Sequence, residues 1–203
     1  MNTLQKNNKI EIRNLLIATG RKLVADWGAE FLTARKLSEA SGCSVGTIYN
    51  QFANMDNFVM EQNLITINEL SEVLSFVDGG CDFYRRINRY VDAYVDWIIN
   101  HKNLWLLLYN FHLQNDVANL PIDYKRAFLK VCVIPEKDFD NAFRRLSAKE
   151  RRVSRQILLT TIFATSSFLL VQSTGKVSKK NACKLLVNTY LAGLEVLKRV
   201  NRK

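Results

Sequence analysis

The side chains best suited to specific binding chemistry fall in one short run of small and polar residues. The run comprises Ser44, Val45, Gly46, Thr47, Asn50 and Gln51. Its hydroxyls and amides both donate and accept hydrogen bonds, which is the chemistry that contacts base edges and phosphate oxygens in nucleic acids. Its smallest members would let the backbone approach a large partner closely. The pattern therefore favours contacts to nucleic acid.

Two short helices are predicted to position this run. Thr33 can cap a first helix over residues 34–40, because its hydroxyl can accept from a backbone N–H that has no helical partner. Gly42 follows where the chain must take a positive φ, and Ser44 can cap a second helix, Val45–Phe52. Two short helices joined by a sharp turn place the second one in the DNA major groove. The spacing alone also fits a plain helical hairpin with a glycine turn.

The apolar spacing predicts which faces of these helices are buried. Leu37 and Ala40 are spaced to face inward from the first helix, and Ile48 and Phe52 from the second. The polar residues of the second helix then lie on its opposite face. Its N-terminus projects backbone N–H groups, which suit an anionic phosphate.

Residues 9–60 resemble the DNA-binding domain of the TetR family of bacterial transcriptional regulators. The residues that match the family in order and spacing are Ile12, Ala18, Leu23, Trp27, Gly28, Ala29, Thr33, Leu37, Ala40, Gly42, Ser44, Gly46, Thr47, Ile48, Tyr49, Phe52, Asp56 and Phe58. The run from Gly42 to Phe52 is the most specific part. The rest of the chain resembles the family only in length and helical character.

The resemblance implies an N-terminal three-helix domain over residues 8–60 that binds a double-stranded DNA operator. It also implies a larger helical domain over residues 61–203, with a small-molecule pocket and a homodimer interface. We expect a DNA-binding transcriptional regulator, a ligand-responsive homodimeric repressor. The effector would shift the protein toward a form whose two recognition helices no longer match the operator spacing.

Roles in DNA binding follow from the matched positions. We expect base-edge contacts from Thr47 and Asn50. Close approach to bases and backbone is predicted for Ser44, Val45 and Gly46. Phosphate contacts are predicted for Thr33, Arg35, Lys36, Tyr49 and Gln51. For any one cation, a solvated charged surface is an equally good interpretation.

Two positions depart from the family pattern. The family usually has a phosphate-binding lysine where this chain has Met55, which puts one backbone contact in doubt. Gln51 stands where histidine is frequent, and its amide can still donate to a phosphate.

The large positive net charge is only weak support for nucleic-acid binding, because of where the charges lie in the chain. The 203 residues carry a formal charge of +10. Residues 1–60 hold seven Lys and Arg against five Asp and Glu, whereas residues 61–203 hold 22 against 14. The N-terminal part therefore contributes +2 and the remainder +8, so most of the basic excess lies outside the predicted DNA-binding domain.

Composition predicts an all-α protein. The chain is 48% hydrophobic and contains only two prolines, Pro121 and Pro135, so long helical stretches run uninterrupted. No alternating strand pattern flanked by turns stands out. The polar start has no signal-peptide core, and the apolar stretch 157–171 contains Thr and Ser. We expect a cytoplasmic protein with no membrane span.

Metal and enzyme chemistry find no support in the sequence. The four cysteines lie far apart, and no CxxC pair or His–Cys cluster occurs. His101 and His112 form no recognisable catalytic set, and there is no phosphate loop. We expect no catalytic residues, no metal and no cofactor. A complete set of catalytic residues in a cleft would instead support the hypothesis of an all-α enzyme.

The last two long helices are the predicted dimer interface. Their candidate apolar stripes are Leu158, Ile162, Thr165 and Leu169, and then Leu186, Tyr190, Leu194 and Leu197. Two copies could bury these stripes as a four-helix bundle. Periodicity alone equally fits packing inside one subunit, and the family resemblance favours the dimer.

Aromatic residues of the C-terminal half are candidates for an effector pocket. The proposed lining residues are Trp97, Trp105, Tyr109, His112, Phe128 and Phe163. An aromatic pocket with few charges suits a small apolar or aromatic effector, although most large aromatics at helical spacing form ordinary core.

An alternative keeps DNA binding but makes the C-terminal domain bind a protein partner in place of a small molecule. The basic surface of such an adaptor would include Arg144, Arg145, Arg151, Arg152 and Arg155. A closed apolar cavity would favour the sensor, and a solid core with an exposed patch would favour the adaptor.

Overall fold

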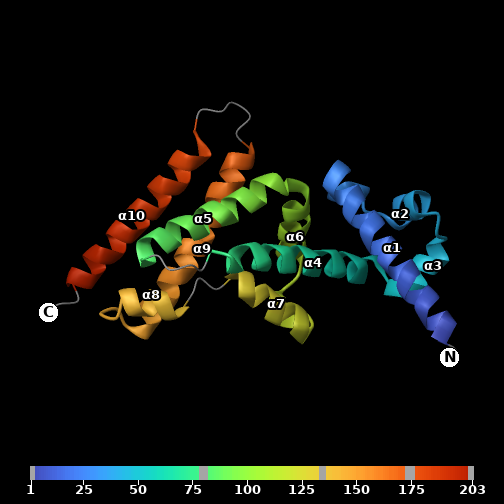
Figure 1. The fold of residues 1–203 in the computed structure, drawn as a ribbon, viewed down its shortest axis with the longest axis horizontal. Coiled ribbons are helices and arrows are strands. Elements are labelled where there is room, and N and C mark those ends of the chain that lie inside the picture. The colour runs from blue at the N-terminus through green and yellow to red at the C-terminus, as the bar shows by residue number, and fades with distance from the viewer. Residues whose placement is uncertain (1–2, 78–81, 133–135, 172–176, 201–203) are drawn as a thin grey trace. The chain divides into compact units, whose positions relative to one another are not determined.

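The computed structural model describes residues 3–77, 82–132, 136–171 and 177–200, and over these ranges it contains helices and no strands. The elements in chain order are α1 (Thr3–Trp27), η1 (Ala29–Phe31), α2 (Ala34–Ser41), α3 (Val45–Phe52), α4 (Met55–Ser75), α5 (Phe83–Asn100), α6 (Lys102–Gln114), η2 (Val117–Asn119), α7 (Ile122–Cys132), α8 (Glu136–Ala142), α9 (Ala148–Val171) and α10 (Lys179–Val200), as Figure 1 shows. The predicted all-α class is confirmed.

The chain groups into two compact units. The first comprises Met1–Asn68 and His101–Ala127, and the second comprises Glu69–Asn100 and Phe128–Lys203. Helices α4 and α7 contribute residues to both. The first unit therefore contains the N-terminal helices together with α6, which packs on α1 and η1.

Helix boundaries follow the capping residues closely. Asn54 accepts from the Asn57 N–H at 2.8 Å and begins α4. Ser147 and Glu150 form a reciprocal capping box at the start of α9: the Ser147 N–H donates to the Glu150 carboxylate at 2.7 Å, and the Glu150 N–H donates to the Ser147 hydroxyl at 3.2 Å. Ser178 caps α10. The predicted helix ends at Asp78–Gly80 and Gly175 lie outside the described residues.

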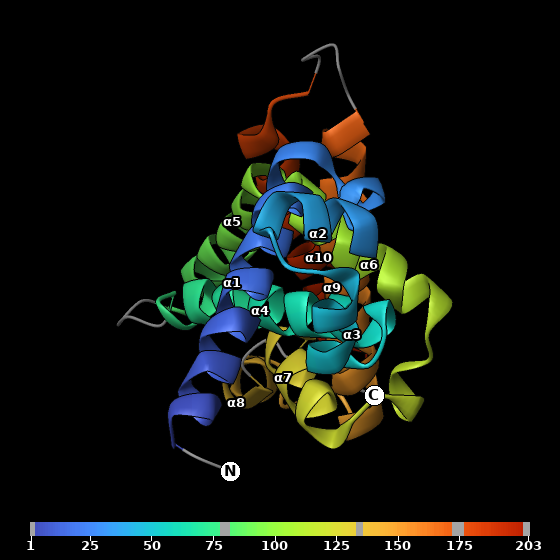
Figure 2. The same ribbon diagram turned by 90° about the vertical axis from the view of Figure 1, so that its right-hand side faces the viewer.

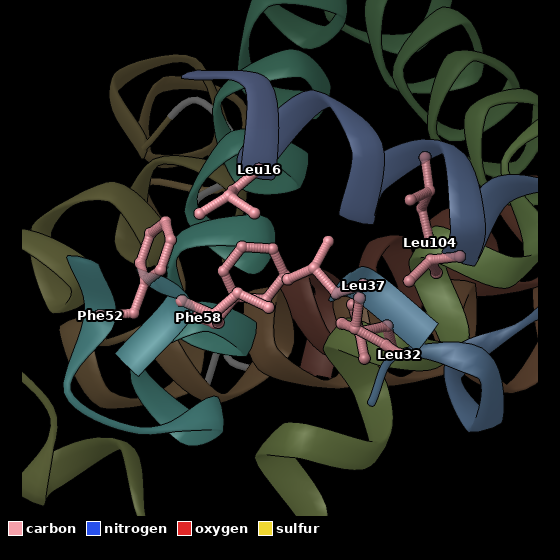
Figure 3. Close-up of a cluster of buried hydrophobic side chains, with 9 residues drawn as sticks. Leu16, Leu32, Leu37, Phe52, Phe58 and Leu104 are labelled. Carbon is pink, nitrogen blue, oxygen red and sulfur yellow. The ribbon is translucent and has the colours of Figure 1, made fainter. Parts of the chain in front are cut away.

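A single apolar cluster holds the N-terminal helices together. Leu16 of α1, Phe52 of α3 and Phe58 of α4 converge in it, as Figure 3 shows. Phe52 and Phe58 meet edge to face with ring centroids 4.7 Å apart, a favoured arrangement of aromatic pairs. Leu104 and Leu107 of α6 complete the cluster. This core fixes the position of α3 while leaving its outer face exposed.

In the second unit, α5 packs against both α9 and α10, which also contact each other (Figure 1). The spacing of Tyr90, Ala93, Tyr94 and Trp97 predicts one apolar stripe on α5; Tyr90, Tyr94 and Trp97 are buried, and Ala93 is half-buried. One inward assignment in the N-terminal helices is wrong, because Ala40 is exposed. Helix α2 has only two turns, so it buries Leu37 alone.

Helix α9 bears on the expectation that the chain has no membrane span. By length and composition alone, its 24 residues are enough to cross a bilayer, and only 22% of its most apolar window is buried within the chain. The expectation rested on the shorter stretch 157–171, which contains Thr and Ser. A core helix of a soluble protein meets the same criteria, and α9 buries Leu158 and Ile162 in the second unit.

Candidate nucleic-acid interface

The turn between α2 and α3 is fixed by local hydrogen bonds. The Thr33 hydroxyl accepts from the Lys36 N–H at 3.2 Å and caps α2. Gly42 ends that helix with φ 72°, and its N–H donates to the Ser38 carbonyl at 3.0 Å. A left-handed backbone is open to glycine at little cost. The Ser38 hydroxyl donates to the Cys43 carbonyl at 2.6 Å, which ties the turn back to α2.

Helix α3 is anchored on one face and open on the other. Ser44 caps it by accepting from the Thr47 N–H at 3.1 Å, and the two hydroxyl oxygens lie 2.9 Å apart. Ile48 and Phe52 are buried at 0% and 4% exposure. The helix ends match the sequence prediction because Ser44 and the buried pair define them.

The predicted DNA-contacting residues all reach the surface of α2 and α3, the helices turned toward the viewer in Figure 2. The exposed ones are Thr33, Arg35, Lys36, Ser44, Val45, Gly46, Tyr49 and Asn50. Thr47 and Gln51 are half-buried. The face therefore combines hydroxyls, an amide, a phenol and a glycine backbone with two flanking cations, and its contacts with DNA remain predictions.

Besides the capping hydroxyls, the two cations and Gln51 also have partners in the protein. The Arg35 Nε lies 3.0 Å from one carboxylate oxygen of Glu39, and the Lys36 Nζ lies 3.8 Å from the other. Exposed pairs of this kind contribute little to stability, so a phosphate can replace the carboxylate at small cost. The Gln51 amide donates to the Lys9 carbonyl at 3.3 Å, and this bond must be exchanged before Gln51 can meet a phosphate.

Arg13 connects the end of α3 to its neighbours. Its guanidinium donates to the Gln51 carbonyl at 2.7 Å, forms an ion pair with Glu61, and lies 4.3 Å from the centre of the Phe52 ring. The guanidinium thus satisfies an end-of-helix carbonyl and holds α1, α3 and α4 together.

The link from α3 to α4 is a strained turn. Ala53 has φ 64° and ψ −43°, and it is the only non-glycine residue with positive φ among those the structure describes. The Asn54 N–H donates to the Phe52 carbonyl at 2.8 Å, which closes a three-residue γ-turn around Ala53. A β-carbon in this backbone region costs free energy, so the turn holds α3 at a cost that glycine would avoid.

A buried polar cluster in the first unit contains His112, a predicted pocket residue, together with Asn63 and Tyr124, which the sequence did not suggest. The Tyr124 hydroxyl lies 3.0 Å from His112 Nε2, and burial lowers the pKa of His112 to about 4. Asn63 of α4 is fully buried, and its amide makes no hydrogen bond of ordinary length with the described residues. Burial raises the pKa of Tyr124, while the Asn63 amide acts in the opposite direction. The three side chains thus form a desolvated polar cluster within the first unit.

Comparison with solved structures decides the fold. The chain matches a TetR-like transcriptional regulator from Rhodococcus sp. RHA1 with a TM-score of 0.63 at 12% identity, covering 91% of this chain and 96% of that one. The fold is that of TetR-like regulators. The fatty acid degradation regulator FadR from Bacillus halodurans matches with a TM-score of 0.62 at 15% identity, over 90% and 96% of the two chains. RolR, solved in complex with resorcinol, matches with a TM-score of 0.64 at 11% identity, over 98% and 96%.

At these identities the likeness establishes the TetR-like fold alone. No family model matches the chain, and a search of curated proteins finds no match. Within this fold, the departure at Met55 has a structural account, because its half-buried side chain packs against the N-terminal core. A lysine there would extend toward solvent, whereas Met55 contributes an apolar contact.

The six predicted pocket residues divide between the two units. Trp105, Tyr109 and His112 belong to the first unit, and Trp97, Phe128 and Phe163 to the second. Trp97 and Trp105 are buried, at 5% and 4% exposure, whereas Tyr109 is 39% exposed. An open apolar hollow of about 600 Å³ occurs elsewhere, between α9 and α10, and none of the six lines it. The effector pocket remains a prediction.

Proposed function

We propose that the protein is a homodimeric transcriptional regulator that binds double-stranded operator DNA through α3. The observation that carries this proposal is the capped, core-anchored α3 with its exposed polar face. The TetR-like fold supports the same function. A two-fold dimer would place the two recognition helices on half-sites one helical turn, about 34–36 Å, apart.

Binding of the purified protein to its own upstream DNA tests the proposal. Asn50→Ala and Thr47→Ala should each weaken binding about tenfold, since one base contact contributes about 1–3 kcal/mol. Asn110→Ala is the matched control, because Asn110 is an exposed helical asparagine of the same unit outside α2 and α3. Fluorescence anisotropy measures the affinities. Equal affinity of the wild type for operator and for random DNA would contradict the proposal.

Phosphate and base contacts can be separated by salt. Lys36→Gln should weaken binding to all sequences alike and reduce the slope of log K against log salt by about 1. Asn50→Ala should instead leave that slope unchanged and relax sequence preference. A Lys36→Gln variant with an unchanged slope would remove Lys36 from the phosphate contacts.

The dimer interface is proposed on the outer face of α9 and α10. The structure revises the predicted stripes, because Leu158, Ile162 and Leu194 are buried inside the single chain. The large apolar residues that remain half or more exposed on the two helices are Ile157, Phe168, Val171, Leu185, Val196 and Val200. With the open hollow between the helices, they form an apolar surface that a second copy would cover.

Leu185→Glu should convert the dimer to monomers, because it places a charge in this surface. Leu113→Glu is a closely matched control, since both leucines are 68% exposed and Leu113 lies on α6 of the first unit. Sedimentation equilibrium measures the mass. A monomeric wild-type protein would refute the proposed dimer. Dimers that survive Leu185→Glu would show that the interface lies on another surface.

We further infer that a small aromatic effector carrying a hydroxyl group binds at the cluster of Asn63, His112 and Tyr124 and releases the DNA. The full burial of the polar Asn63 side chain beside Tyr124 supports this inference. Resorcinol, bound by the structurally similar RolR, is a first probe. Loss of operator binding on adding the probe, abolished by Asn63→Leu, is the expected result. A protein whose DNA affinity responds to no aromatic hydroxyl compound would instead favour the adaptor with a protein partner.

A further inference from the structure

The basic excess of the C-terminal part of the chain is partly concentrated in one groove. This groove lies between α5 and α10, which pack against each other in the second unit (Figure 1). Its lining residues are Arg85, Asn88, Arg89, Asp92, Lys180, Lys184 and Asn188. All seven are polar, and they include four cations and a single carboxylate.

The spacing within each helix creates the groove. The α5 residues follow a 0, 3, 4, 7 pattern, and the α10 residues follow a 0, 4, 8 pattern, so each set occupies one helical face. At 1.5 Å per residue these faces extend over about 10–12 Å. The hollow has a volume of about 400 Å³. This is a compact site of small-molecule dimensions.

Paired charges flank the groove along the same helix–helix seam. Towards one end, Lys179 forms an ion pair with Asp96. Towards the other, the Tyr84 hydroxyl donates to Glu195 at 2.6 Å, and this bond raises the pKa of Tyr84 to about 12. Glu195 also lies 3.2 Å from the Lys198 Nζ. Carboxylates therefore accompany the cations at both flanks, whereas the groove between them has an excess of cations.

The carboxylates near the groove do not balance its cations. Among the described residues that line the groove, Asp92 is one carboxylate against four cations, and desolvation raises the pKa of Asp92. Arg85 lies 3.4 Å from Asp82 outside the lining, and both side chains are more than half exposed. An exposed pair of this kind is easily exchanged for a stronger anion.

We propose that the α5–α10 groove binds a compact polyanion made of two or three linked phosphate groups. Guanidinium groups bind phosphate oxygens bidentately, and lysine ammonium groups add point charges. The amides of Asn88 and Asn188 supply uncharged donors at both walls. A linked di- or triphosphate concentrates several negative charges within the length of the groove, which a single phosphate or a carboxylate does not.

The lining disfavours an acidic peptide as the occupant. Peptide and protein interfaces depend on a few buried apolar or aromatic anchors, and none of the seven lining residues is apolar. The groove is also separate from the apolar surface proposed for the dimer, because the two use different residues of α10. The proposal for the α5–α10 groove does not rest on the proposed DNA binding, because the groove residues lie outside α2 and α3.

Isothermal titration calorimetry of the full-length protein with inorganic tripolyphosphate at low salt tests the proposal. We expect one site per chain. Arg85→Gln and Lys184→Gln should each weaken binding about five- to tenfold, as expected for loss of one charge-assisted contact at an exposed site. Lys22→Gln, which removes an exposed cation of α1, should leave the affinity unchanged. Asp92→Asn should tighten binding, because it removes the one opposing charge; a misfolded variant would not produce this gain.

Four outcomes would overturn the proposal. Orthophosphate that binds as tightly as tripolyphosphate would show that linked phosphates are not recognised. A hexaglutamate peptide that binds more tightly would assign the groove to acidic protein segments. If the groove variants bind tripolyphosphate with wild-type affinity, the anion binds at another basic surface. Absence of any binding at low salt would show that the groove is only a solvated charged face.

Discussion

The close packing of α1 on α4 makes Gly20 a sensitive position. A β-carbon built on Gly20 lies 2.5 Å from Phe58 Cζ and 2.6 Å from Cε1. Carbon atoms pack best at about 3.5–4.0 Å, so the ring would have to move by about 1 Å. Phe58 is fully buried and already packed edge to face on Phe52. The ring therefore cannot retreat without disturbing the core that positions α3.

Two terms set the expected cost of Gly20→Ala. Overpacking a buried site costs about 1–3 kcal/mol. Replacing glycine by alanine within a helix returns about 1 kcal/mol. We therefore expect Gly20→Ala to lower the free energy of unfolding by about 1 kcal/mol. Gly46→Ala is the control, since its β-carbon meets only the Ser44 Oγ, at 3.7 Å, and retains the helical gain.

A double-mutant cycle isolates the clash from helix propensity. Phe58→Leu shortens the side chain, so the new methyl group at position 20 should occupy vacated space. The double variant should be more stable than the sum of the single effects by about 1–2 kcal/mol. Urea denaturation followed by circular dichroism, at one fixed protein concentration, gives the three values. Additivity within about 0.5 kcal/mol would refute the packing argument.

Three further predictions follow from single positions. Gly46→Ala should stabilise the protein by up to about 1 kcal/mol yet weaken operator binding, because a methyl group would intrude where DNA approaches; unchanged affinity in an anisotropy titration would count against close approach there. Ala53→Gly should stabilise by about 1 kcal/mol in urea denaturation by relieving the positive φ, and a destabilised variant would disprove the strain. The pKa of His112 is about 4 in the folded protein, so the unfolded state binds the proton more tightly and stability should fall as the pH drops from about 6.5 towards 4, by about 2 kcal/mol after discounting for partial exposure. His112→Gln should flatten this pH dependence, and an unaltered slope would assign it to other groups.

Local chemistry made the helix-turn-helix predictable. Thr33, Gly42 and Ser44 act within a few residues of themselves, so their caps and turn could be inferred without tertiary information. The apolar pattern predicts the first helix only from Ile10, whereas α1 begins at Thr3, because its first residues are polar and lack an apolar stripe. The interactions of Arg13 could not be inferred, because its partners on α3 and α4 are far away in sequence.

Some features of the C-terminal helices depend on tertiary packing and could not be predicted from the sequence. Periodicity marked Leu158 and Leu194 as interface candidates, but only the packing of α9 and α10 on α5 shows that they are already buried. The basic groove escaped notice for a related reason. Arg85 and Arg89 are one helical turn apart, as are Lys180 and Lys184, but nothing in the sequence brings the two pairs together.

If the proposed dimer covers α9, the low burial of this helix within one chain makes folding depend on the concentration of the protein. Subunits that associate at about 10⁵–10⁷ M⁻¹s⁻¹ and are present at about 10 nM wait roughly 10–1,000 s for a partner. During that interval a helix apolar enough to enter a bilayer remains accessible to chaperones, proteases and other nascent chains. Scarce chains would therefore be lost before they pair, whereas neighbouring ribosomes on one message would supply partners at once. Co-translational pairing would then determine how much of this protein survives when its gene is weakly expressed.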